Sequence, residues 1–270
     1  MSAATASRHA AGPVKLTWPG VLRSEWTKLW SLRSSVYTLL AAVAVMIGFG
    51  LIFAAAQTAG PGHPGPPGAG DPATAPLDGV YLAQLVIAVQ GVLLISGEYA
   101  TGSIRSTLAA VPSRLPVLWA KGAVLAAVTL TLMAAAAIAA FLGGQAVLSG
   151  KHLGASLSEP GMLRAVLGAA LYLTVAGLLG LGLGALLRRT AAAIAVAAGL
   201  LLVLPILASL LPGSWSSHIT KFLPANAGQA ILNVHHVADS LSPWAGLALF
   251  SAYAVAALAA AAILLLRRDA

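Results

Sequence analysis

Six long apolar stretches constrain this chain more than any other feature of its sequence. Each comes close to or exceeds the about 20 residues with which an α-helix crosses the hydrocarbon core of a bilayer. Their alanine, leucine and glycine content favours helices, which satisfy every backbone polar group within one segment when lipid surrounds them. The expected spans are residues 36–56, 79–97, 117–141, 165–187, 191–211 and 244–266.

The remaining composition agrees with a membrane environment. Only 8% of the residues are charged, whereas an ordinary soluble domain is about one-quarter charged. The sequence therefore predicts an all-α integral membrane protein with two parts. A disordered cytoplasmic tail is expected over residues 1–19, and a single six-span transmembrane domain over residues 20–270.

Basic residues predict the orientation of the spans. Of the 15 lysines and arginines, all but Lys151, Arg164 and Lys221 fall on the side of the membrane that carries both chain ends. Because basic residues are enriched in cytoplasmic loops, both termini are expected in the cytoplasm. The net charge of +8 is assigned to this topology and to contact with anionic lipid, not to nucleic acid.

The segment before the first span predicts an amphipathic helix in the cytoplasmic interface. Over residues 20–33, Leu22, Trp26, Leu29 and Trp30 cluster on one side of a helical wheel. Tryptophan rings favour the headgroup level of a membrane, and Arg23, Glu25 and Lys28 interrupt any span here. The alternative is a simple extension of the first span. The residues assigned to this interfacial helix are Arg23, Glu25, Trp26, Lys28 and Trp30.

The loop between the second and third spans is the longest on the cytoplasmic side. Within residues 98–121, Ile104, Leu108 and Val111 recur at helical spacing, which predicts a short amphipathic helix. Pro112 would end that helix, and Pro116 would begin the third span. The apolar stripe favours a docking surface over an ordinary connector.

Polar groups within the spans are few. Gln84 and Gln90 in the second span could line a route for a substrate or form hydrogen bonds between helices, and the second role is the more common. No ionisable residue is expected at mid-membrane, which argues against ion-coupled transport. Gly180 and Gly184 form a GxxxG pattern that favours close helix packing.

Catalytic and metal-binding motifs are absent from the sequence. It contains no cysteine, no P-loop, no H-E-x-x-H and no G-x-S-x-G. His218, His235 and His236 in the last outer loop lack metal-ligand spacing and are interpreted as solvated. The chain is therefore expected to be neither an enzyme nor a metalloprotein.

Three segments resemble the type-2 permeases of ATP-binding-cassette (ABC) transporters, in particular actinobacterial members. One runs from Glu98 through Gly102, Leu108 and Pro112-Ser113-Arg114 to Lys121. The others are Arg23-Ser24-Glu25-Trp26-Thr27-Lys28-Leu29 and Leu223-Pro224-Ala225-Asn226-Ala227-Gly228-Gln229. They occur in the family's order and cover most of the chain.

The resemblance implies a half-transporter in a bacterial plasma membrane. A second permease protomer, identical or different, and separate cytoplasmic ATPase subunits would complete an exporter, and the ATPases would hold ATP and magnesium. The family's loop between spans two and three contacts the ATPase. Carried over, the ATPase-coupling residues are Glu98, Gly102, Ile104, Arg105, Leu108, Val111, Pro112 and Arg114.

The resemblance raises a role for Gln84 and Gln90 in the translocation route, because the family's second and fifth spans often line it. The Pro- and Gly-rich loop at residues 57–78 matches nothing in the family. Two other interpretations stay open. One is a membrane protein that docks a cytoplasmic partner without transport, and the other, disfavoured by the missing catalytic cluster, is a lipid-modifying enzyme. An apolar interior suggests an amphiphilic or lipid-like cargo.

Overall fold

The computed structural model describes residues 17–58, 71–101, 114–151, 153–210, 212, 218–235 and 240–267. These residues form helices and connecting turns, and no strand occurs among them. The longer helices are α1 (Trp18–Ser31), α2 (Arg33–Gln57), α3 (Val80–Thr101), α5 (Arg114–Ser149), α6 (Met162–Leu187), α7 (Thr190–Ala198) and α11 (Pro243–Arg267). The shorter ones are η1 (Ala75–Leu77), η2 (Gly199–Val203), α8 (Leu204–Ser209), η3 (Thr220–Phe222), α10 (Pro224–Gln229) and η4 (Ala230–Leu232).

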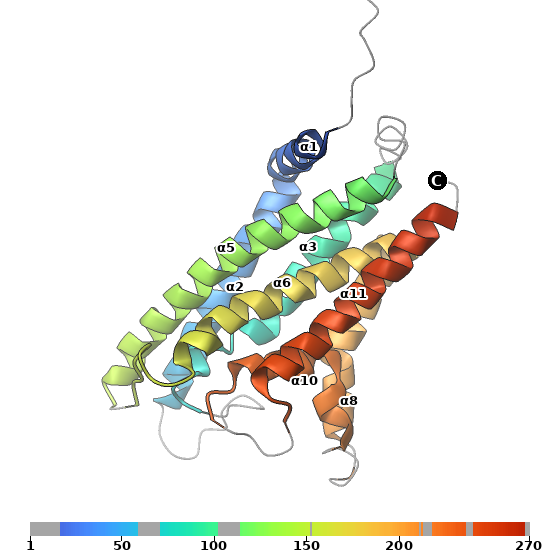
Figure 1. The fold of residues 1–270 in the computed structure, drawn as a ribbon. Helices are drawn as coiled ribbons and strands as arrows, with labels where there is room; N and C mark the ends of the chain where they lie inside the picture. The colour runs from blue at the N-terminus through green and yellow to red at the C-terminus, as the bar shows by residue number, and fades with distance from the viewer. Residues whose placement is uncertain are drawn as a thin grey trace, which may run out of the picture.

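Six helical segments in the described part of the chain are long and apolar enough to cross a membrane, which confirms the expected spans. They run alternately up and down, so α1 and the last turn of α11 lie at one end of the bundle, and α8 and α10 lie at the other (Figure 1). These ends are called the α1 end and the α10 end. The described basic residues gather at the α1 end, apart from Lys151, Arg164 and Lys221.

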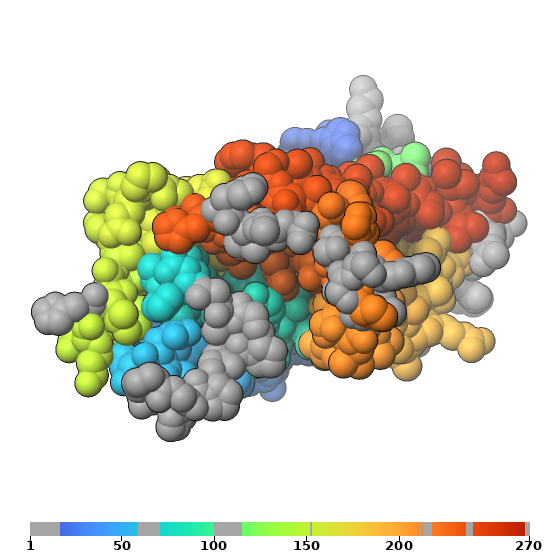
Figure 2. Space-filling model, turned by 90° about the horizontal axis from the view of Figure 1, so that it is seen from below, coloured from blue at the N-terminus to red at the C-terminus, as the bar shows by residue number. Residues whose placement is uncertain are grey.

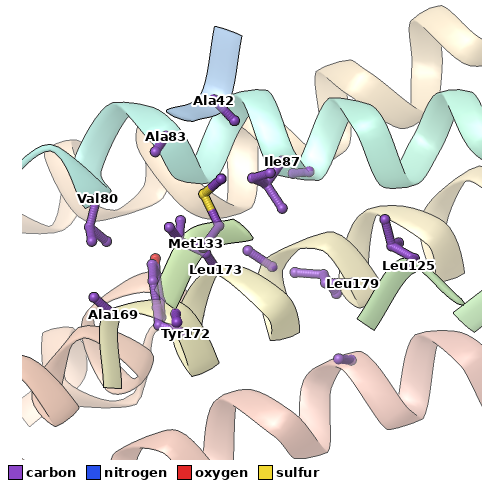
Figure 3. Packing of buried hydrophobic residues seen from close by; sticks show 14 of the residues in the cluster. Ala42, Val80, Ala83, Ile87, Leu125, Met133, Ala169, Tyr172, Leu173 and Leu179 are labelled. Atoms are coloured by element: carbon purple, nitrogen blue, oxygen red, sulfur yellow. The ribbon is translucent and has the colours of Figure 1, made fainter. Parts of the chain in front are cut away.

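Helices α3 and α6 form the centre of the bundle and are its most buried spans. Figure 3 shows side chains of α2, α3, α5 and α6 meeting in the core, among them Ala42, Ile87, Met133 and Leu173. Glycines bring the two central helices together. A Cβ at Gly180 would overlap the carbonyl oxygen of Ala88, and one at Gly91 would overlap that of Gly177. The close packing expected from the glycine pattern is therefore confirmed.

The third span is longer than its hydropathy predicts. Helix α5 continues past the expected end at Phe141 through Gly143 and Gly144 to Ser149. A Cβ at Gly144 would overlap the ring of Pro76 in η1. The glycine pair does not end the helix, because tertiary packing against η1 compensates for its weak helix propensity. Gly144 lets the helix approach the turn that precedes α3.

The segment before the first span is a separate helix and not an extension of it. Helix α1 ends at Ser31 and α2 begins at Arg33, with Leu32 between them in an extended conformation. Val21, Glu25 and Leu29, which are four residues apart, form the buried side of α1. Trp26 and Trp30 lie on the exposed side. The expected apolar cluster is therefore divided, because Leu29 packs inward and the two tryptophans point outward.

Candidate functional site

Four charged side chains from three helices form a cluster at the α1 end. The Nζ atom of Lys121 lies 2.5 Å from Oε2 of Glu25 and 2.7 Å from Oε1 of Glu98. The Nζ atom of Lys28 lies 2.9 Å from Oε1 of Glu25 and 3.2 Å from Oε1 of Glu98. Each lysine donates to both carboxylates, so the two positive and two negative charges balance. We call Glu25, Lys28, Glu98 and Lys121 the ion tetrad.

Burial makes the ion tetrad energetically costly unless its charges are closely paired. The side chains of Lys121 and Glu25 are only 1% and 2% exposed. Removing such charges from water costs several kcal/mol for each ion, and only close, well-oriented partners offset that cost. Helix α1 presents Glu25 on its buried side, and α5 presents Lys121 near its beginning. Because neither charge is satisfied alone, docking of α1 onto the bundle depends on the cluster as a whole.

Lys28 is the tetrad member closest to solvent, with a side chain that is 37% exposed. Partial burial by itself lowers the pKa of its ammonium group. Hydrogen bonds and charge attraction from Glu25 and Glu98 outweigh that effect, and the pKa is raised above its ordinary value of 10.5. Lys28 therefore stays charged throughout the physiological pH range and pairs with both carboxylates on the solvent side of the cluster.

The last turn of α3 also contacts the tight turn between α6 and α7. The hydroxyl of Thr190 lies 2.9 Å from that of Ser96. The guanidinium carbon of Arg188 lies 5.2 Å from the ring centre of Tyr99, a cation–π distance. Arg188 itself adopts a left-handed backbone conformation with φ of 53°. One helical turn, Ser96 to Tyr99, thus joins α1 and α5 on one side and the α6–α7 turn on the other.

The loop for which an ATPase contact is predicted follows this turn in the sequence. Gly102, Ile104, Arg105, Leu108, Val111 and Pro112 lie outside the described residues, and so does the short amphipathic helix expected there. Glu98 and the backbone of Arg114, which flank the loop, are described. The structure brings Glu98 together with Glu25 and Lys28, which sequence reasoning had assigned to a separate interfacial helix. Arg23 and Trp26 of that helix are exposed.

Gln84 lies in a buried chain of neutral hydrogen bonds toward the α10 end. Tyr172 of α6 donates its hydroxyl to Oε1 of Gln84, and Nε2 of Gln229 donates to the Tyr172 oxygen over 3.3 Å. In Figure 3 the Tyr172 ring stands among core residues, with its oxygen toward α3. This contact links α3, α6 and α10. Gln84 therefore bonds between helices, and its role in a substrate route stays a prediction.

The amide nitrogen of Gln84 contacts an irregular turn in the fifth span. Pro205 has no N–H to offer the carbonyl four residues earlier, which belongs to Leu201. The helix is a π turn at Gly199–Val203, just before this proline. Nε2 of Gln84 lies 3.4 Å from the Leu201 oxygen and 2.9 Å from that of Tyr81. The side chain thus ties the irregular part of the fifth span to α3.

Gln90 has a different environment. Its side chain is fully buried, and neither its amide nitrogen nor its amide oxygen has a hydrogen-bond partner among the described residues. Such a group is costly inside a bundle. The two glutamines predicted to line a route therefore differ in their contacts. Gln84 forms hydrogen bonds between helices, whereas the Gln90 amide has no partner among the described residues.

Several residues of these networks were not singled out from sequence. Tyr172 and Gln229 carry no motif, and Lys121 was noted only as part of the permease-like pattern. The available signal was an ionisable residue within an expected span, since such residues face the bundle interior and find partners. The partner itself could not be deduced, because Glu25 and Lys121 are far apart in the chain.

The fold and these sites define a multi-pass, all-helical membrane protein whose first helix is fastened to the bundle by buried charges. Comparison with family models, with curated proteins and with solved structures finds no match to the chain.

Proposed function

We propose that this chain is the membrane-spanning permease subunit of an ABC exporter in a bacterial plasma membrane. The observation that supports the proposal best is the position of Glu98. It belongs to the ion tetrad, and the loop from residue 102 to 113, which resembles the ATPase-contacting loop of type-2 permeases, begins a few residues later. A force applied to that loop would reach α1, α5 and the α6–α7 turn through one helical turn.

The orientation in this proposal follows from the charges. The α1 end, where the described basic residues gather, faces the cytoplasm, and Trp26 and Trp30 of α1 lie at the lipid headgroups. The α10 end faces outward. A second permease protomer and two cytoplasmic ATPase subunits complete the transporter, and the ATPases supply the bound ATP, the magnesium and the hydrolysis. The permease chain contacts lipid, not nucleic acid, and catalyses no reaction.

Transport in this scheme works by alternating access. ATP binding brings the partner ATPases together, and the coupling loop moves with them. The loop binds the two ATPase states with different affinity, and only that difference can shift the conformation of the spans. The buried tetrad transmits the movement, because its four charges cannot separate without large desolvation costs. The cargo is amphiphilic or lipid-like, in keeping with the apolar spans.

A pull-down in mild detergent from the native host tests the proposal. We expect a P-loop ATPase to co-purify with the tagged chain and to show ATPase activity. Leu108→Asp in the coupling loop should abolish both, while Leu153→Asp, an exposed leucine at the α10 end, should leave both unchanged. Equal capture with both variants would show that the coupling assignment is wrong.

A second variant separates binding from transmission. Glu98→Gln keeps the loop sequence and removes one tetrad charge, so the ATPase should still co-purify while transport in proteoliposomes falls. Absence of any ATPase, in a detergent that preserves a known transporter complex, would favour a docking or sensor protein instead. Selective transport of small hydrophilic ions would contradict the amphiphilic cargo.

A further inference from the structure

A cavity of about 560 Å³, lined by both polar and apolar side chains, opens at the α10 end of the bundle. The turn before α3 and the beginning of α3 form one wall, and α10, η4 and the residues after them form the other. Figure 2 views this end and shows the cyan segment that begins at residue 71 against the orange segment around residue 235. Cavities of this size hold small organic molecules.

One acidic side chain that lines this cavity has no counter-charge among the residues that the structure describes. Asp78 is partly buried and lines the cavity, and its carboxylate makes no ion pair or hydrogen bond with the residues that the structure describes. The second aspartate, Asp71, is already paired, because its Oδ2 lies 3.1 Å from Nε2 of His235. Lys221 also lines the cavity, but its ammonium lies near the ring of Phe222, 5.5 Å from the ring centre. Asp78 is therefore a carboxyl group on the cavity wall that the described residues leave without a partner.

A second acceptor without a partner lies just beneath the cavity wall. The side-chain oxygen of Asn226 in α10 is buried and accepts no hydrogen bond from the described residues. A buried acceptor without a donor costs about 1–3 kcal/mol in the free energy of folding. Asp78 is therefore the unpartnered acceptor that lines the cavity, whereas the Asn226 oxygen lies beneath the cavity surface.

The cavity is better suited to an organic cation than to a metal ion. Its volume is far larger than a metal ion needs, and the described residues contain no group of three or more histidine or acidic side chains close enough to hold a metal. Leu77, Tyr81 and Leu232 supply apolar surface on the same cavity as Asp78. A protonated amine combines a positive charge, N–H donors and an organic body.

We propose that this cavity binds an organic ligand that carries a protonated amine. The ammonium group pairs with Asp78, and the organic part lies against Leu77, Tyr81 and Leu232. The site is connected to the core, because Gln229 lines the cavity and also donates to Tyr172. The proposal does not depend on an ATPase partner, and the purified chain tests it alone.

Binding of 2-phenylethylamine to the purified full-length chain is the direct test. The chain is placed in nanodiscs of phosphatidylglycerol, which has no amine headgroup, and titrated by calorimetry at neutral pH. We expect saturable binding of the amine. The neutral analogue 2-phenylethanol has nearly the same shape and no charge, and it should bind at least about tenfold more weakly, the scale of a charge-assisted hydrogen bond.

Variants locate the site. Asp78→Asn should weaken binding of the amine at least about tenfold and leave binding of the alcohol unchanged. Asp71→Asn, at the paired aspartate on the same cavity, is the matched control and should retain the affinity for the amine. Asn226→Asp adds a second carboxylate and should strengthen binding of the amine, which tests the site even if the Asp78 variant does not fold.

Three results would overturn the proposal: no binding of the amine, equal binding of the amine and the alcohol, or unchanged amine affinity in a folded Asp78→Asn variant. A last comparison identifies the natural source of the amine. If phosphatidylethanolamine in the nanodiscs competes with 2-phenylethylamine, the ligand is a lipid headgroup. If affinity is unchanged, the ligand is a soluble amine. Either result retains the site.

Discussion

The two ends of the bundle secure their buried polar groups in different ways. At the α1 end, four full charges close on one another, and the Lys121 side chain is almost completely buried. Toward the α10 end, the amides of Gln84 and Gln229 and the Tyr172 hydroxyl form a neutral chain. A buried charge depends on its partner for several kcal/mol, whereas a neutral hydrogen bond contributes about 1 kcal/mol. Helix α1 is therefore fastened as a unit, while the α10 end is held by separable contacts.

The largest effect is expected from Lys121→Met. This change removes the cation between two carboxylates and leaves Glu25 buried with Lys28 as its only remaining cationic partner. We expect a loss of about 3–5 kcal/mol in the free energy of unfolding, because breaking a buried pair leaves an uncompensated charge. Thermal unfolding in detergent measures the change. Lys151→Met, an exposed lysine at the α10 end, is the control and should change stability by less than about 0.5 kcal/mol.

A double variant distinguishes charge from packing in the same cluster. Glu25→Gln combined with Lys121→Met removes one charge of each sign and leaves the Lys28–Glu98 pair. It should be more stable than Lys121→Met alone. A double variant whose loss equals or exceeds the sum of the two single losses would contradict the charge argument.

The contact between the central helices should be the next most sensitive feature. Gly180→Ala places a methyl group against the backbone carbonyl of Ala88, which cannot move away without separating α3 from α6. We expect a loss of up to about 3 kcal/mol, as for an overpacked core. Gly48→Ala is the control, since nothing lies within 4 Å of a Cβ there. A neutral result for Gly180→Ala would mean that the central helices are not rigidly packed.

Breaking the neutral hydrogen-bond chain of Gln84, Tyr172 and Gln229 should cost less stability than breaking the ion tetrad. Tyr172→Phe keeps the ring stacked on Phe250 and removes only the hydroxyl between Gln84 and Gln229. We expect a loss of about 2 kcal/mol, because the Gln84 oxygen is left buried without its donor. Tyr253→Phe, whose hydroxyl is exposed and donates to a backbone carbonyl, should cost less. If Tyr172→Phe cost as much as Lys121→Met, the contrast between the two ends would not hold.

The smallest effect concerns the pH dependence of Lys28. Burial, the largest single effect, lowers the pKa of Lys28 in the folded chain. Glu25 and Glu98 together raise the pKa by more, so that it lies above 10.5. A raised lysine pKa stabilises the fold fully below about pH 10.5, and the stabilisation is lost as pH rises through the folded value. Solvent screening limits the contribution to about 0.2–1 kcal/mol. The difference in stability between wild type and Lys28→Gln should be constant from pH 7 to 10 and shrink above that range.

The sequence predicted the elements of the fold well and the contacts of the site poorly. Hydropathy located every described span, and its errors were at boundaries, as where α5 passes Gly143 and Gly144. The sequence also identifies Glu25, Lys28 and Glu98 at the α1 end as candidate functional residues. Their contact was not predicted, because the sequence assigned Glu25 to an interfacial helix by its charge alone and gave no face for it, whereas it lies on the buried side of α1.

By itself, the sequence determined that this chain is a bundle of six membrane-length helices with its basic residues gathered at one end. Span length and the cost of unsatisfied backbone groups in lipid impose that outcome locally, residue by residue. Only the tertiary structure decided that Lys121 would meet Glu25 and Glu98, and that Asp78 would face a cavity without a partner. Those outcomes depend on which helices adjoin and at what rotation, which close packing determines across long sequence separations.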